Sequence, residues 1–493
     1  MRIRNFVLLS FFGLSLAVCI AACDKNKDDN DDNTNNIDST SIAIVIKDIN
    51  GSINKVVDAK NGKVMSQIEQ KEYLEKVALE FMGITQADDF KDLVDLGEYI
   101  SETYIENYDW NNVEDWANDA FESTREALGT KTKDTETTNW IGWDGKYYTY
   151  IDNYIYTNYK SLLLASNFTG HFTANNGRWL QDKADDLQFI FTDKQGQQCV
   201  VKLTTSGSVK KVYMLNVDDW QRYDYESNGN TSTYNEYYDR TQLTIGVPEK
   251  VEVLLTQGGK QVVKSTLSID LGSIDGEEFD ISRSNLSISA TVELNNGYKI
   301  ETARMAYSGN TSTAASFILS KNNTHLVSMG VSADVVNLPS VNISAFSSDS
   351  FDEEDYNFDD ANAKKAFVKL DILGKVQIQG TLSDVRKFAD YLDAAAENDN
   401  NEKNYKSYIN QANALMDVNL FYDGKGVKQA ATKLEPFAEE SWNGRTYWES
   451  EPVIFFYDGT SYSTFEAFFN ERDFKKTIDT FEKLIDNYAE LAD

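Results

Sequence analysis

Aromatic side chains crowd one stretch of the chain, from Trp140 to Tyr159. Successive side chains of a strand point to opposite faces, so every second residue shares a face. Four of the tyrosines then share one face, with Asp152 between them, beside two tryptophans. Aromatic rings pack against the apolar C–H faces of sugars, while hydroxyl and carboxylate groups supply hydrogen bonds. We therefore predict a ligand-binding row of Trp140, Trp143, Tyr148, Tyr150, Tyr154 and Tyr156.

A second aromatic patch follows further along the chain. Its members are Trp220, Tyr223, Tyr225, Tyr234, Tyr237 and Tyr238. Both patches have a competing interpretation, because tyrosine is a good strand residue and its amphipathic ring often lines a half-buried sheet face. A purely structural role is therefore the alternative to ligand binding.

Catalytic signals are sparse. The chain holds two histidines, His171 and His325, and no HExxH, GxSxG, GxGxxG or phosphate-loop motif. We interpret His171 as a polar strand residue and Cys199, in an alternating apolar run, as a small buried hydrophobe. A pair of carboxylates for glycoside hydrolysis stays open, but with 79 acidic residues the sequence selects no pair. We predict a non-enzymatic protein without a cofactor.

One acidic stretch has the oxygen-rich composition of a calcium loop. Residues 347–360 read SSDSFDEEDYNFDD. The stretch lacks a glycine at the position where an EF-hand loop turns sharply, and runs of like charge are usually solvated. We therefore interpret residues 347–362 as an acidic linker and predict no metal site.

The N-terminus has the layout of an export signal. Arg2 and Arg4 precede an apolar run, and Ala21 and Ala22 precede Cys23 directly. This arrangement resembles the lipobox of bacterial lipoproteins. The resemblance implies a signal peptide over residues 1–22, removed before Cys23, and a lipid attached to the thiol of Cys23. Two or more acyl chains anchor a protein stably to a membrane.

A polar segment follows the cysteine. Residues 24–36 read DKNKDDNDDNTNN and contain no apolar side chain, so residues 23–40 are predicted to be a disordered acidic tether. Acidic residues just after the lipid-bearing cysteine resemble the export signal of surface lipoproteins of Bacteroidetes. The resemblance implies an outer-membrane protein that faces the medium, with the membrane as partner through Cys23.

The charge of the chain limits its other partners. Its formal net charge of −32 becomes −34 once residues 1–22, with two basic and no acidic residues, are removed. Such a charge repels phosphate backbones, and we predict no nucleic-acid binding. Only Cys199 then remains besides Cys23, which excludes a disulfide between two unmodified cysteines of the folded part.

Hydrophobic periodicity divides the rest into three regions. Residues 41–130 combine a strand at 41–49 with three helices, the first opened by a capping box from Ser66 to Glu69. After a polar linker at 130–138, residues 139–346 alternate with period two between Gly and Asn turns. Residues 363–493 mix helices and hairpins. We predict an α+β fold, in which a large antiparallel β-meander, a curved sheet or half-barrel, is flanked by an N-terminal helical region and a C-terminal α+β region.

Three functions fit this architecture, and the folded part resembles no characterised family. A glycan-binding protein requires Trp140 and Tyr148 exposed in a row. A carrier of lipid or another apolar ligand requires a deep apolar cavity between curved sheet and helices, an idea that rests on fold analogy alone. A structural or adhesive surface lipoprotein requires a large exposed apolar patch.

Overall fold

The structure is a computed structural model of the chain. It describes residues 63–123, 126–160, 163–164, 169–272, 277–278, 286–308, 312–336, 362–440, 445–460, 462–470 and 472–492. The predicted signal peptide, Cys23, the tether, the strand at 41–49 and the linker up to residue 361 lie outside the described residues.

The fold is α+β, an open, curved and largely antiparallel sheet with helices at both ends of the described chain. Its helical segments are α3 (Gln67–Ile84), η1 (Ala87–Phe90), α4 (Lys91–Ile100), η2 (Ser101–Ile105), α5 (Asn111–Ser123), α6 (Val385–Ala396), α7 (Glu402–Leu415), α8 (Phe465–Phe468) and α9 (Lys475–Ala492). In the described part of the chain, no helix is both long and apolar enough to cross a bilayer.

The strands form one sheet. They are β1 (Glu126–Ile141), β2 (Tyr147–Lys160), β3 (Leu163–Leu164), β4 (Gly170–Asn175), β5 (Arg178–Asp182), β6 (Leu187–Thr192), β7 (Gln198–Asn228), β8 (Thr231–Gln257), β9 (Lys260–Asp270), β10 (Glu277–Glu278), β11 (Leu286–Leu294), β12 (Tyr298–Ser308), β13 (Ser312–Lys321), β14 (Thr324–Val336), β15 (Asn362–Ile372), β16 (Val376–Leu382), β17 (Met416–Tyr422), β18 (Ala430–Glu440), β19 (Thr446–Phe456) and β20 (Ser463–Thr464). From β6 to β20, successive strands pair antiparallel, except that β10 pairs parallel with β7 and β9 pairs directly with β11.

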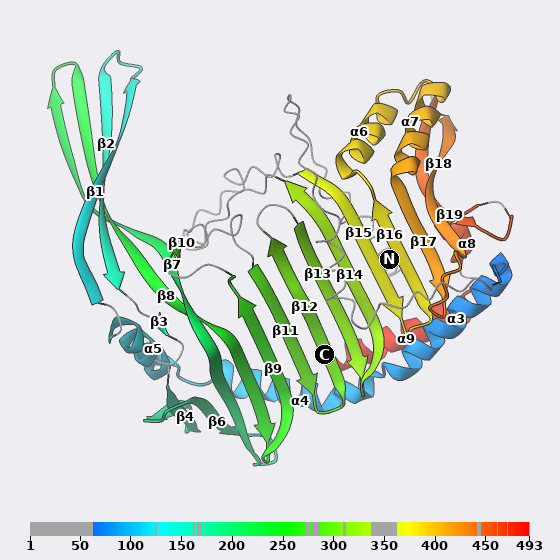
Figure 1. Ribbon diagram of the computed structural model, residues 1–493. Coiled ribbons are helices and arrows are strands. Elements are labelled where there is room, and N and C mark those ends of the chain that lie inside the picture. The colour runs from blue at the N-terminus through cyan, green and yellow to red at the C-terminus, as the bar shows by residue number, and fades with distance from the viewer. Residues whose placement is uncertain are drawn as a thin grey trace.

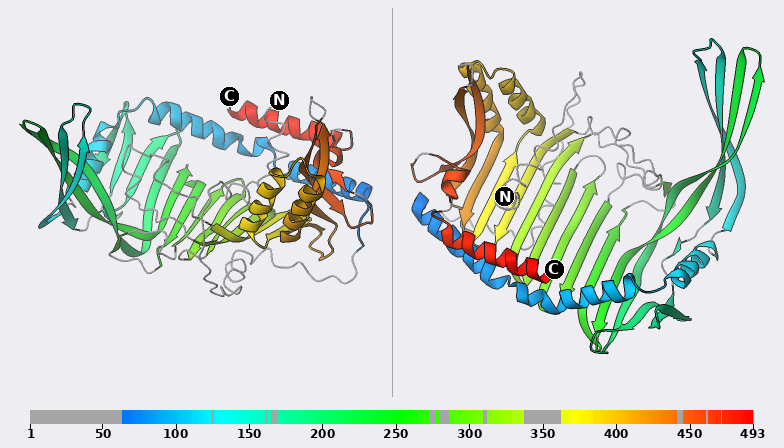
Figure 2. Two further views of the ribbon diagram at one scale, coloured as in Figure 1. Left: turned by 90° about the horizontal axis from the view of Figure 1, so that it is seen from above. Right: turned by 180° about the vertical axis from the view of Figure 1, so that it is seen from behind.

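An arm projects from one end of the sheet. The far halves of β7 and β8 continue beyond the sheet and join β1 and β2, whereas α6 and α7 stand at the opposite end (Figure 1). Seen from above and from behind, α3, α4 and α9 lie together on one face and run across the strands (Figure 2). The arm therefore projects away from the face that α3, α4 and α9 cover, with α5 beside its base.

Turn chemistry sets the meander, as predicted. The Asn296-Gly297 turn joins β11 to β12, and the Gly258-Gly259 turn joins β8 to β9. Gly297 has a φ of +86°, and a Cβ there would lie 2.1 Å from Oδ1 of Asn322 in the next turn. The positive φ favours glycine here, and any side chain would require Asn322 to move.

The two faces of the sheet differ in polarity. Val251 and Val253 of β8 share a face with Leu267 of β9, as strict alternation and register require. The opposite face carries ion pairs, for example Glu252 with Lys264 at 3.1 Å. One face is therefore apolar here and the other polar, although Ser328 and Gln377 of the polar face are buried further along the sheet.

Helices α3 and η1 bind the turn ends of the strands. Asp89 accepts hydrogen bonds from the hydroxyl of Tyr298 at 2.9 Å and from Lys321 Nζ at 2.6 Å. Further along the helix, Lys375 Nζ contacts Glu80 Oε1 at 2.6 Å. These polar contacts hold hairpins that are distant in sequence against the continuous helical segment of α3 and η1.

Two main clusters of apolar side chains fill the space between helices and sheet. Phe172, Trp179 and Cys199 are buried at one end, where α4 and α5 pack on β4 to β7. Phe388 and Ile409 lie at the other end, between α6, α7 and the sheet. The buried Cys199 confirms its interpretation as a small hydrophobe.

Two sequence-based expectations need correction. We expected the third helix to reach residue 129 and a linker to follow at 130–138, but α5 ends at Ser123 and β1 begins at Glu126. We also expected only antiparallel pairing in the β region, whereas β2 runs parallel to β8 and β4 parallel to β6. The first difference arises because β1 pairs with the following strand β2, and the pairing of β2 with β8 joins segments that are far apart in sequence.

The predicted capping box opens α3 and makes stability depend on pH. Ser66 N–H donates to Glu69 Oε2 at 2.7 Å, and the Ser66 oxygen accepts from Glu69 N–H. The Ser66 amide, Lys63 and the Ser66 hydroxyl, which all donate to the carboxylate, lower the pKa of Glu69 from its ordinary 4.5 to about 2. Because the folded pKa is depressed, the stabilisation is complete above pH 4.5 and is lost as pH falls towards 2.

We therefore expect Glu69→Gln to destabilise the protein near neutral pH, and the difference from wild type to shrink between pH 4.5 and 2. Urea unfolding at several pH values measures this difference. Glu72→Gln, exposed on the same helix, is the control. A difference that stays constant across this range would contradict the role of Glu69.

Candidate ligand-binding site

The arm is built from two hairpins joined along a parallel seam. Strands β1 and β2 pair antiparallel, as do β7 and β8, and β2 pairs with β8 from Tyr147 opposite Thr231 to Asn158 opposite Gln242. At the tip, Tyr147 N–H donates to Asn230 O at 2.9 Å. Further down, the buried Asn153 donates from Nδ2 to Glu236 O at 3.1 Å. The order across the arm is therefore β1, β2, β8, β7.

This seam brings members of both aromatic patches together on one face. Trp140 stacks on Tyr148 with ring centroids 4.9 Å apart, and Tyr148 lies 6.2 Å from Tyr234. The rings of Tyr150 and Tyr234 are stacked and nearly parallel, with an interplanar angle of 7° and 4.6 Å between their centroids. The rings thus continue from β1 through β2 to β8 without a gap.

The stacking extends to the fourth strand. Tyr223 and Tyr225 of β7 lie 5.8 and 4.9 Å from Tyr234, and Tyr154 stacks on Tyr238 at 5.4 Å. Tyr234 contacts four rings and is the centre of the set. We call the set the aromatic ladder: Trp140, Tyr148, Tyr150, Tyr154, Tyr223, Tyr225, Tyr234 and Tyr238.

Exposure is greatest at the two edges of the ladder. Trp140 on β1 is 44% exposed, and Tyr225 on β7 is 50% exposed, while the rings of β2 and β8 are half-buried between them. Neighbouring centroids 4.6–6.2 Å apart leave no room for another ring between them. A ligand can stack on the outer rings and lie over the edges of the inner ones.

The turn at the tip fixes the position of Tyr148. Gly142 allows the ring to approach, since a Cβ at this residue would lie 2.4 Å from Cε2 of Tyr148. The Tyr148 hydroxyl donates to Asp144 Oδ2 at 2.9 Å. The Lys146 amide and this hydroxyl hold the pKa of Asp144 below its usual range. The tip therefore presents an ordered ring and an ionised carboxylate together.

The predicted site residues separate into three groups. Trp140, Tyr148, Tyr150 and Tyr154 join the ladder. Trp143 lies in the tip turn, fully exposed, with the exposed Ile141 and Tyr147 at the adjoining strand ends. The backbone of Tyr156 continues the seam, but its side chain, like that of Trp220, lies outside the described part, as does Cys23.

The predicted row omitted the β7 and β8 members of the ladder. Tyr223, Tyr225, Tyr234 and Tyr238 were noted only as a separate patch. The turn signal Asn228-Gly229-Asn230 lies between two alternating Tyr-rich runs and would have predicted this hairpin. Nothing local in the sequence indicates that the hairpin joins β2.

The histidine of strand β4 is part of a charged cluster. His171 Nε2 lies 2.6 Å from Asp186 Oδ1, and Lys202 Nζ lies 2.6 Å from Asp186 Oδ2. Lys202, Gln188 and His171 hold the pKa of Asp186 far below its usual range. A carboxylate fixed in this way orients the imidazole on a strand, as expected for a polar strand residue.

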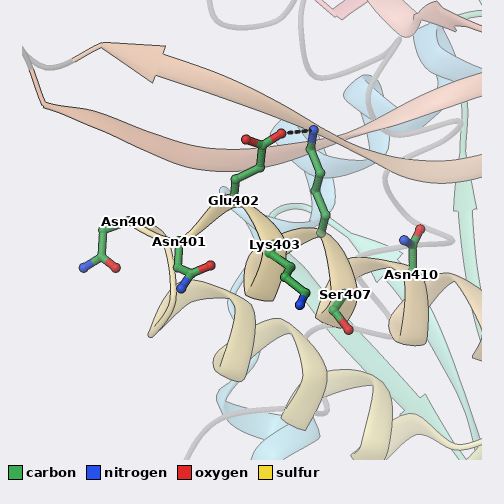
Figure 3. Close-up of a pocket in the computed structure, with 7 residues that line it drawn as sticks. Asn400, Asn401, Glu402, Lys403, Ser407 and Asn410 are labelled. Atoms are coloured by element: carbon green, nitrogen blue, oxygen red, sulfur yellow. Dashed lines mark hydrogen bonds and ion pairs between the residues drawn. The ribbon is translucent and has the colours of Figure 1, made fainter.

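A depression lies at the start of α7. It has a volume of about 760 Å³ and is open to solvent. Asn400, Asn401, Glu402, Lys403 and Asn410 are among the polar side chains around it, and Lys406 pairs with Glu402 at 2.7 Å (Figure 3). It differs from the deep apolar cavity that a lipid carrier requires.

Within the described ranges, no group of three His, Cys, Asp or Glu side chains is placed to hold a metal ion. The aromatic ladder, with its exposed outer rings, makes the arm our candidate site. In comparisons with known proteins, no protein family, curated protein or solved structure matches this chain.

Proposed function

We propose that this chain is a lipid-anchored binding protein of the outer membrane, facing the medium, that holds glycans on the aromatic ladder. The observation that carries the proposal is the continuity of the ladder across four strands, with its exposed rings at both edges. The lipobox resemblance at Cys23 supports the location.

The physical argument concerns the chemistry of the exposed rings. Tyr and Trp present large rigid apolar areas with a polar group at the rim, and such side chains are enriched at binding surfaces. Sugars present the complementary pattern of C–H faces and hydroxyl edges. Rings placed in series across a sheet fit an extended chain of sugar units better than a single compact molecule.

Binding without hydrolysis is the proposed outcome. The carboxylates on the ladder face stand on an open sheet, where they are exposed or half-buried. Glycoside hydrolysis requires two carboxyl groups on either side of a bound sugar bond. We therefore expect bound oligosaccharides to be recovered intact, and release of shorter sugars by the purified chain would contradict this part.

The test is a screen of host and dietary oligosaccharides against the chain lacking residues 1–23, none of which belongs to the described fold. Calorimetry then compares variants at the edges of the ladder. We expect Trp140→Ala and Tyr225→Ala each to weaken binding by about fivefold, equivalent to about 1 kcal/mol for an exposed aromatic contact.

A matched control lies on the other face of the arm. Tyr237 belongs to the same strand as Tyr234, but its ring packs under Arg222, with 4.1 Å between Cζ and the ring centroid. Tyr237→Ala should leave affinity unchanged. Absence of binding to every oligosaccharide by a folded chain would refute the proposal.

The tip of the arm supports a second candidate, adhesion to another protein. Ile141, Trp143 and Tyr147 are more exposed than any ladder ring, and exposed apolar groups in one place mark interaction surfaces. The two candidates separate by variant: adhesion to cells or matrix should depend on Trp143, whereas glycan affinity should depend on Trp140 and Tyr225.

A further inference from the structure

A row of carboxylates crosses the ladder face. Glu136 of β1 lies directly opposite Asp152 of β2, and Asp152 lies directly opposite Glu236 of β8. Tyr223 of β7 completes the row. Residues in register share a face, so the three acidic side chains stand between the Tyr150 and Tyr154 levels of the ladder. We call Glu136, Asp152 and Glu236 the carboxylate row.

Elsewhere in the sheet, several carboxylates are paired with lysines. On its polar face, Glu252 lies between Lys250 and Lys264, at 3.6 and 3.1 Å. Lys299 likewise contacts Glu301 at 2.7 Å. Like charges directly opposite each other destabilise a sheet, and cross-strand pairs of opposite charge stabilise it. The carboxylate row differs from these Lys–Glu pairs, and Glu435 opposite Glu451 in β18 and β19 is a second case of facing carboxylates.

No Lys or Arg of the described residues forms an ion pair with the row. Burial raises the pKa of Asp152, and the carboxylates of Glu236 and Glu136 raise it further. The hydroxyl of Tyr238 donates to Glu236, which fixes one carboxylate beside a ladder ring. The nearby Arg222 is turned to the opposite face, over Tyr237.

We propose that the carboxylate row and the flanking rings select glycans that carry a free ammonium group, that is, unacetylated amino sugars. This inference rests on the proposed function. Ring faces attract cations, and a carboxylate accepts short charge-assisted hydrogen bonds from an ammonium group. The same row repels uronic acids and other acidic sugars by like charge.

The test uses three oligosaccharide probes of equal length: β-1,4-linked glucosamine, its N-acetylated form, and galacturonic acid. Calorimetry is run at slightly acidic pH, at which the sugar amine is charged. We expect the amine to bind about tenfold more tightly than the acetylated form at low salt, with the preference reduced in concentrated salt, and the acid to bind most weakly.

Variants then assign the preference to named side chains. Asp152→Asn and Glu236→Gln should each remove most of the preference for the amine while affinity for the acetylated sugar is retained. Glu226→Gln, at an exposed position of β7 on the opposite face, is the matched control and should change neither. Since neutral side chains relieve repulsion in the row, both row variants should melt no lower than wild type.

The outcomes separate this inference from the proposed function. Equal affinity for the amine and its acetylated form would overturn the inference and leave glycan binding intact. Failure of all three probes and of the wider glycan screen would overturn both. Binding of oligolysine as tightly as the amino sugar would also overturn the inference, because the selected ligand would then be a cationic peptide.

Discussion

Tyr234→Ala is expected to weaken glycan binding by about 30-fold or more, corresponding to the 2 kcal/mol or more typical of a central interface residue. Tyr234 touches Tyr148, Tyr150, Tyr223 and Tyr225, so its removal separates the rings of β2 from those of β7. Each ring contact is worth about 0.5–1.5 kcal/mol beyond the buried area, so the arm should also open more readily. Calorimetry measures the affinity, and amide exchange along β2 and β8 measures the opening.

The conservative variant separates the ring from its hydroxyl. Tyr234→Phe retains the ring and its four ring contacts, so it should keep most of the affinity and the amide protection. Tyr237→Ala removes an equally large ring from the other face of the same strand. Unchanged affinity in Tyr234→Ala would show that ligands bypass the ladder.

Phe172→Ala is expected to lower the free energy of unfolding by about 3–5 kcal/mol, the usual cost of emptying a fully buried aromatic site. Phe172 is completely buried on β4, where Trp116 lies 4.9 Å and Phe189 5.2 Å from its ring. The cavity would lie between α5 and the sheet, at the base of the arm. Urea unfolding followed by tryptophan fluorescence measures the loss, because Trp116 and Trp179 belong to the same cluster.

The control for this variant is a substitution on the neighbouring strand, β5. Leu180 of β5 is 39% exposed, and Leu180→Ala should cost far less than Phe172→Ala because water already reaches the side chain. If the two variants lost equal stability, this cluster would not be a core that holds the helices to the sheet.

Local chemistry explains which parts of the fold the sequence predicts. Turns such as Asn296-Gly297 and Gly258-Gly259, between alternating runs, suffice to place the hairpins of the meander. The capping box at Ser66 and Glu69 opens α3 where expected. In each case the deciding interactions join residues close in the chain, so a short window contains the whole signal.

Strand β1 shows where local signals mislead. Glu126, Ala127 and Leu128 favour a helix, and the polar run after Gly129 has no apolar alternation. The backbone nevertheless becomes a strand because β2 offers hydrogen-bonding partners along its length, with Asp134 opposite Tyr154 and Trp140 opposite Tyr148. An edge strand on an exposed arm needs no apolar face, so hydrophobic periodicity does not report it.

Only part of the candidate site could be predicted from the sequence. Alternation alone put Tyr148, Tyr150 and Tyr154 on one face, and the structure places them there in stacked contacts. The union with Tyr234 and Tyr238 depends on the parallel seam, which no periodicity predicts. The carboxylate row is likewise invisible in the sequence, because its members come from three strands.

The parallel seam between β2 and β8 also has a consequence for the order in which the arm folds during synthesis. Each hairpin of the arm closes over a short turn, but Asn153 and Glu236, which meet across the seam, are 83 residues apart. The β1–β2 hairpin therefore emerges well before β8 has been synthesised. Throughout that interval its inner backbone edge is unsatisfied and open to pairing with other nascent strands, so a chaperone that shields this edge should favour correct folding of the chain.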